Sequence, residues 1–76
     1  MAKYFGLIAQ DGDAVFFEFG DYERAVVVQE RLDILSSGDN TWKAGQLKVI
    51  AFADATQACI DATLARMEQA LEQSAG

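Results

Sequence analysis

Two short runs of apolar residues, 4–9 and 14–19, open the chain and are rich in aromatic and branched side chains. Such runs are typical of β-strands. Asp11-Gly12 lies between them and indicates a hairpin, because a two-residue type I′ turn needs positive φ at both central positions. We therefore predict a hairpin with Asp11-Gly12 as its loop. The expected facing pairs are Gln10–Asp13, Ile8–Val15, Gly6–Phe17 and Tyr4–Phe19.

A stretch with helical periodicity follows at residues 22–35, and Asp21 is the expected N-cap. Three consecutive valines at 26–28 lower helix propensity and leave a strand as the competing interpretation. The charged residues in this stretch fit a helix better. The sequence Ser-Ser-Gly-Asp-Asn at 36–40 predicts the loop that ends the helix. The apolar positions at helical spacing are Tyr22, Ala25, Val28, Leu32 and Leu35, with Val26, Val27 and Ile34 beside them.

Residues 46–53 predict a third strand, and residues 55–73 predict a second helix. Asp54 and Gln57 have the spacing of a capping box at the start of that helix. Its main apolar stripe is expected at Ile60, Leu64, Met67 and Leu71.

The predicted order of elements is β-β-α-β-α in one domain that spans residues 1–76. A helical crossover returns the third strand beside the first, which gives a three-stranded antiparallel sheet of order 2-1-3. We expect both helices to cover one face of this sheet, so the fold class is α+β.

Composition excludes several kinds of chemistry. The chain has no histidine and one cysteine, which excludes the common zinc sites and every Ser-His or Cys-His catalytic arrangement. Gly20, Gly38 and Gly45 stand alone and form no phosphate-binding loop. The carboxylates fall in no catalytic motif. We therefore expect a protein that is not an enzyme, with no catalytic, metal or cofactor residues, in which Cys59 is a small buried apolar residue.

The net charge of the chain limits the classes of partner that it can bind. Six basic residues stand against twelve acidic ones, so the formal net charge is −6. The basic residues are scattered, which argues against binding to nucleic acid or to an anionic membrane surface. The sequence shows neither a signal peptide nor a spanning segment, and we expect a cytoplasmic protein. A basic protein would suit this charge.

The hairpin is apolar on both sides, which a hairpin covered on only one side does not need. With both helices on one face, the other face would leave a set of apolar side chains in water, and exposed apolar patches of that kind usually mark an interaction site. The alternative is that a helix or the loop around Trp42 covers them. The residues expected to mediate self-association are Phe5, Leu7, Phe16 and Phe52.

Acidic residues recur every seven positions along the second helix, as Asp54, Asp61 and Glu68, with Glu72 one turn further. This strip is either a solvated face or a docking surface for a basic protein. Trp42, in the loop before the third strand, either packs on the helix ends or anchors a partner.

These surfaces predict a homodimeric protein-interaction module. One alternative is a small-ligand binder with a pocket at the dimer interface. Another is an acidic inhibitor of a nucleic-acid-binding machine, of the type that phages and mobile elements encode.

Overall fold

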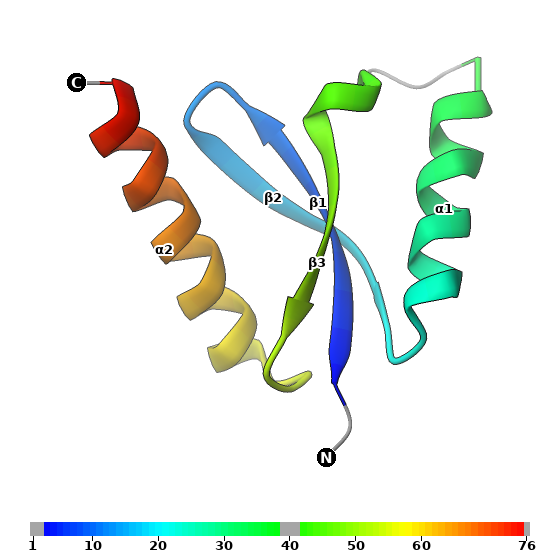
Figure 1. Cartoon of the computed structure of the whole chain (residues 1–76), viewed down its shortest axis with the longest axis horizontal. Helices are drawn as coiled ribbons and strands as arrows, with labels where there is room; N and C mark the ends of the chain where they lie inside the picture. Colours follow the sequence, from blue (N-terminus) through cyan, green and yellow to red (C-terminus); the bar gives the residue numbers. More distant parts are fainter. Residues whose placement is uncertain (1–2, 39–41, 76) are drawn as a thin grey trace.

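The computed structural model describes residues 3–38 and 42–75. The elements are β1 (Tyr4–Asp11), β2 (Ala14–Asp21), α1 (Arg24–Ser36), a short 3₁₀ helix η1 (Ala44–Gln46), β3 (Leu47–Phe52) and α2 (Gln57–Ala75) (Figure 1). The three strands form one antiparallel sheet of order β2-β1-β3. The predicted order of elements and the predicted sheet order are confirmed.

The predicted hairpin register is wrong. Asp11 pairs with Ala14, so the two loop residues are Gly12 and Asp13. Gly12 has φ of 65°, and no other described residue has positive φ. This fits a type II′ turn, which needs positive φ only at its first central position, where glycine adopts it without strain. The predicted type I′ turn would have required a positive φ at Asp11.

An irregularity in the ladder changes the pairing again toward the open end of the hairpin. Ile8 pairs with Phe17, whereas Leu7 pairs with Phe19, so one extra residue of β2 stands at this point. A bulge of this kind inserts a residue into one strand and shifts every later pair. As a result, Phe19 lies on the same face as Leu7 and not on the face that was predicted for it.

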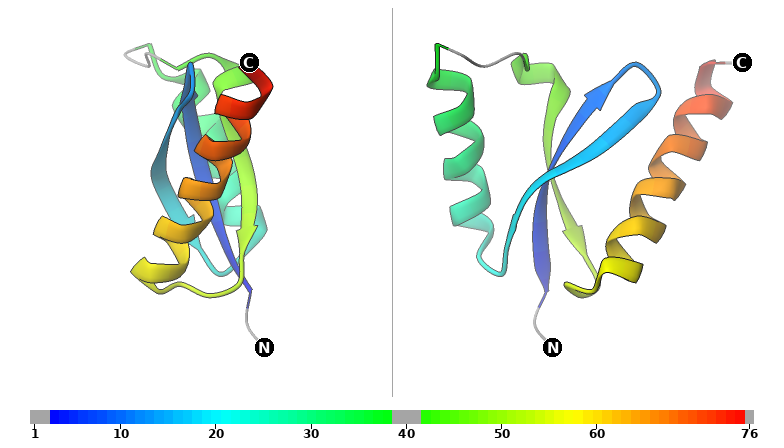
Figure 2. Two further views of the ribbon diagram at one scale, coloured as in Figure 1. Left: turned by 90° about the vertical axis from the view of Figure 1, so that its left-hand side faces the viewer. Right: turned by 180° about the vertical axis from the view of Figure 1, so that it is seen from behind.

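The two helices cover opposite faces of the sheet, and the prediction of both on one face is wrong (Figures 1 and 2). Val27 of α1 packs with Leu7, whereas Ile60 of α2 packs with Ile8. Successive strand residues point to opposite faces. Because Leu7 and Ile8 are both fully buried, β1 needs a cover on each side, and one helix per face supplies it.

Helix α1 begins two residues later than predicted. The Asp21 Oδ1 atom accepts a hydrogen bond from the backbone N–H of Glu23 at 2.8 Å, and Glu23 is the N-cap. Val27 is the fully buried residue of this helix. Arg31 fixes the orientation, since its Nε donates to the Leu47 carbonyl at 3.0 Å. Several apolar residues of the predicted stripe therefore face solvent.

Helix α2 buries the predicted stripe, but its N-terminus differs from the predicted capping box. Its stripe packs against the sheet face that carries Ile8. The helix begins at Gln57, and the hydroxyl of Thr56 accepts a hydrogen bond from the backbone N–H of Cys59 at 3.2 Å. The same hydroxyl and the Thr56 backbone N–H both donate to Asp54. Thr56 takes the capping role because a hydroxyl at this position reaches the third helical N–H directly.

Replacement of Thr56 with alanine should lower the free energy of unfolding by about 1 kcal/mol, the usual cost of losing a capping hydroxyl. The hydrogen bonds from Thr56 hold the pKa of Asp54 below its ordinary value of 3.8. Because the pKa of Asp54 is lowered in the folded state, ionised Asp54 stabilises the fold above pH 3.8. This stabilisation is lost as the pH falls from 3.8 toward the lower pKa of the folded state.

NMR titration of the Asp54 carboxyl group tests this directly. Thr56→Ala should raise the pKa of Asp54, whereas Thr63→Ala, about two helical turns further along, should leave it unchanged. An identical Asp54 pKa in the wild-type protein and in Thr56→Ala would contradict the proposed cap.

Candidate interaction surfaces

The residues predicted for self-association do not form one exposed face. Leu7 is 0% exposed and Phe5 is half-buried in the cluster under α1. Phe52 is 2% exposed in the cluster under α2. The alternative that helices cover these side chains thus holds for Leu7 and Phe52. Phe16 is the member that stays open to solvent, at 47% exposure.

Phe16 lies beside Trp42, the residue predicted as a partner anchor. Their ring centroids are 6.2 Å apart and the rings are tilted by 40°. Trp42 is half-buried and packs against the cluster under α1. This favours the alternative in which Trp42 packs on the domain itself. Phe16 shares a sheet face with its pairing partner Ala9, which belongs to the same cluster. Phe16, which was predicted for self-association, and Trp42, which was predicted to anchor a partner, therefore lie together at the edge of the cluster under α1.

Three further large apolar side chains are exposed on α1 or just before it, and one of them, Tyr22, packs edge to face on Tyr4. Tyr22 precedes α1 and Val26 and Leu32 lie on it. With Phe16 they are the only large exposed hydrophobic residues in the described part of the chain. We call Phe16, Tyr22, Val26, Leu32 and the adjoining Trp42 the α1-side surface. The signal that could have revealed it is the distribution of apolar residues around nearly the whole of α1, which buries only one side.

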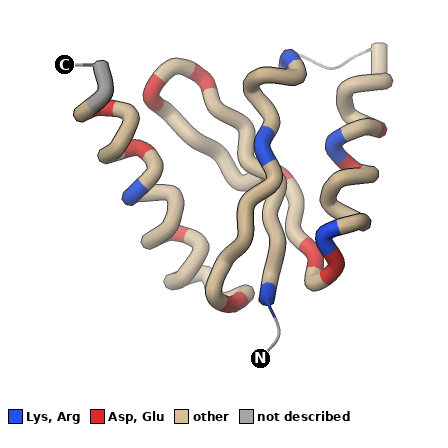
Figure 3. The backbone as a smooth tube through the Cα atoms, viewed as in Figure 1, with Lys and Arg blue, Asp and Glu red and all other residues tan. Residues whose placement is uncertain are grey.

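Charge is distributed unevenly between the two helices (Figure 3). Within α1, Arg24 and Arg31 balance Glu30 and Asp33, so its formal charge is zero. Within α2, Arg66 stands against three carboxylates, so its formal charge is −2. Helix α1 therefore has balanced charges and α2 has a net negative charge, while further acidic residues lie on the hairpin and just before α1.

The acidic strip of α2 is partly engaged within the chain. Asp54, Asp61 and Glu72 are exposed. Glu68 is half-buried, and its Oε2 atom accepts a hydrogen bond from the backbone N–H of Val15 at 3.2 Å. Asp61 accepts a hydrogen bond from the Gln57 amide at 2.8 Å. Glu68 thus occupies an N–H group on the edge strand β2 that could otherwise pair with another chain. The hypothesis of an acidic docking strip did not include this role.

Replacement of Glu68 with alanine should lower the free energy of unfolding by about 1 kcal/mol, because the Val15 N–H loses its acceptor. Hydrogen exchange at the Val15 amide should accelerate. Glu72→Ala removes the same charge from an exposed position of the same helix and should leave both quantities nearly unchanged. Equal effects from the two substitutions would show that Glu68 is only part of a solvated face.

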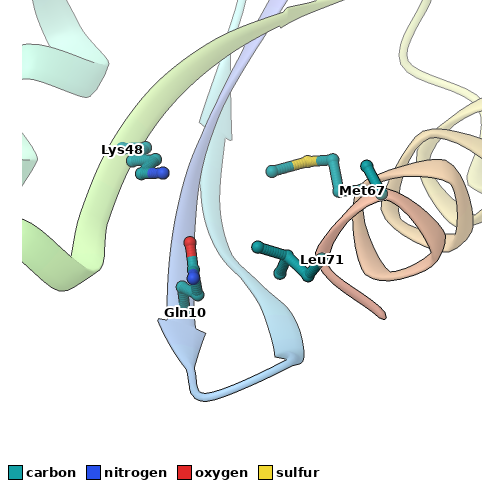
Figure 4. A pocket seen from close by; sticks show the side chains of 5 residues that line it. Gln10, Lys48, Met67 and Leu71 are labelled. Atoms are coloured by element: carbon teal, nitrogen blue, oxygen red, sulfur yellow. The ribbon is translucent and has the colours of Figure 1, made fainter. Parts of the chain in front are cut away.

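A pocket of about 200 Å³ lies between α2 and the sheet (Figure 4). One wall is formed by Gln10 of β1 and Lys48 of β3, and the other by α2. The residues of the α2 wall are Met67, Ala70 and Leu71. Cys59 is half-buried in the apolar cluster on this same face of the sheet, in agreement with its expected packing role.

Neither the described side chains nor the similarity of the chain to other proteins assigns a function. Within residues 3–38 and 42–75, no three histidine, cysteine or acidic side chains come together as a metal site. In the same ranges neither long helix has the apolar character that a membrane span requires. Comparison with protein-family models, with curated proteins and with solved structures finds no match to this chain.

Proposed function

We propose that the protein is a non-enzymatic interaction module that acts as a homodimer through its α1-side surface. The observation that carries the proposal is that every large exposed hydrophobic residue of the described chain lies between positions 16 and 32. Exposed apolar patches on a small domain are typical of an interface. Phe16 and Trp42 supply aromatic side chains, which are enriched at protein–protein interfaces.

A second copy of the chain is the partner that the charge distribution favours. The net charge of −6 makes two copies repel each other, and the repulsion is weakest where charges are balanced. Helix α1 carries equal numbers of basic and acidic residues, so two α1-side surfaces can meet without bringing the α2 carboxylates together. A basic protein would instead be drawn to α2.

The size of the chain supports the same conclusion. A domain of about 60 to 80 residues buries a smaller share of its surface on folding than a larger domain does, and small domains often depend on disulfides, metals or a partner subunit. One cysteine allows no disulfide within the chain, and it fits the reducing environment of the cytoplasm, where we place the protein. Association through the α1-side surface would add apolar burial at about 25 cal/mol per Å², less the cost of association.

Light scattering of the wild-type protein and of three variants tests the proposal. Phe16→Glu and Leu32→Glu each place a charge in the α1-side surface and should shift the mass from twice the 8.3 kDa of one chain to a single chain. Ala62→Glu adds the same charge at an exposed position of α2 and should leave the dimer intact.

The measurement should cover concentrations from about 1 μM to about 500 μM, which bracket a micromolar dissociation constant. Circular dichroism establishes that each variant is folded. A wild-type mass of one chain across this range, or dissociation by Ala62→Glu but not by Phe16→Glu, would overturn the proposal.

A further inference from the structure

The pocket between α2 and the sheet has two walls of different chemistry. Its α2 wall is apolar and includes Met67 and Leu71, whose side chains point toward the sheet (Figure 4). Its sheet wall is polar, because Gln10 and Lys48 extend from neighbouring strands into the same space. Ligand pockets typically combine a mainly apolar lining with a few polar groups that fix orientation.

Lys48 gives this pocket a preference for negatively charged ligands. Among residues 3–38 and 42–75, its ammonium group has no hydrogen bond or ion pair. The guanidinium groups of Arg31 and Arg66, by contrast, donate to acceptors of the chain. An unpaired cation at the edge of an apolar pocket is complementary to a ligand that carries one negative charge on an apolar body.

The volume limits the size of that ligand. An engineered cavity of about 150 Å³ takes up benzene, so a pocket of about 200 Å³ accommodates one six-membered ring and a small polar group. A nucleotide or a phosphorylated sugar is too large and would require several donors. We propose that this pocket binds a small monocarboxylic acid of about eight carbons, with the ring against Met67 and Leu71 and the carboxylate on Lys48.

This site is independent of the proposed homodimer. It lies on the α2 side of the sheet, whereas Trp42 packs against the cluster under α1 and Phe16 shares the sheet face of that cluster. Disruption of one should therefore leave the other unchanged. In particular, Phe16→Glu should bind the small acid as well as the wild-type protein does, so failure of one proposal says nothing against the other.

Titration with phenylacetate, followed by NMR of backbone amides and methyl groups, tests the site. Shifts should concentrate on Gln10, Lys48, Met67 and Leu71, with a dissociation constant of about 1 mM, since a ligand of about ten non-hydrogen atoms makes few contacts. Phenylacetamide has the same shape without the charge and should bind at least about fivefold more weakly.

Variants of two lysines complete the experiment. Lys48→Gln and Lys48→Met both remove the charge at an exposed position and should weaken phenylacetate binding at least about fivefold. Lys3→Gln removes the same charge outside the pocket and should have no effect. Equal binding of the acid and the amide, shifts that map elsewhere on the chain, or no shifts at about 20 mM ligand would each overturn the proposal.

Discussion

Replacement of Leu7 with alanine and, separately, of Ile8 with alanine should each lower the free energy of unfolding by about 3 kcal/mol. Both side chains are 0% exposed, although they are neighbours on one strand and point to opposite faces of the sheet. Leu7 packs under α1, and Ile8 packs under α2. The cost is large because each truncation removes buried methyl groups and leaves a cavity that the surroundings fill only partly.

Urea unfolding of the two variants, with Gln69→Ala as the exposed control, measures this. Gln69 is exposed on α2 and lies outside the α1-side surface, so its truncation should cost far less than either core substitution. If both helices covered one face, only one of the two core substitutions would be costly. A loss below about 1 kcal/mol for either Leu7→Ala or Ile8→Ala would therefore contradict a helix on each face.

Replacement of Gly6 with alanine should lower the free energy of unfolding by about 1 to 3 kcal/mol, the usual cost of overpacking. A Cβ atom at Gly6 would lie 2.7 Å from a ring carbon of Phe17 and would also meet the ring of Phe52. These two rings pack edge to face, with centroids 5.7 Å apart. Gly6 pairs with Gly20, and together the two glycines leave room for the aromatic side chains on the α2 side of the sheet.

Gly45→Ala is the matched control, because nothing lies within 4 Å of a Cβ atom at that position and its φ is not positive. It should stabilise the protein by about 0.4 to 1 kcal/mol through the lower entropy of the unfolded chain. Thermal unfolding of both variants measures the two effects, which should have opposite signs. A Gly6→Ala variant as stable as Gly45→Ala would show that the aromatic rings move aside without cost.

The order of the elements could be predicted because it depends on local patterns, and the strand order then follows from the helical crossover between the hairpin and the third strand. The turn signal around Gly12 and the apolar spacing of α2 are visible in the sequence alone. The hairpin register could not be fixed in the same way, since Asp11-Gly12 and Gly12-Asp13 both offer a two-residue loop with glycine. The bulge in β2 opposite Leu7 and Ile8 shifts the register of the hairpin further, and no local pattern in the sequence of β2 predicts it.

The placement of the helices depends on packing between distant segments. The apolar character of Leu7 and Ile8 indicated that both sides of the hairpin needed cover, and a partner chain or a second helix could supply it equally well. The structure supplies it with one helix on each face, because α1 covers Leu7 and α2 covers Ile8 and Phe52. The apolar residues around α1 indicate that some of them stay exposed, but they do not say which side is buried. The Arg31 contact with Leu47, which comes from a distant segment, settles that orientation.

The most direct test of the homodimer is the dependence of backbone amide chemical shifts on protein concentration. Dilution of the wild-type protein should change the shifts of residues around Phe16, Tyr22, Val26 and Leu32 and leave those of α2 unchanged. Phe16→Glu should show the dilute-state shifts at every concentration. Shifts that do not depend on concentration, or that change along α2 while those of the α1-side surface stay constant, would contradict association through this surface.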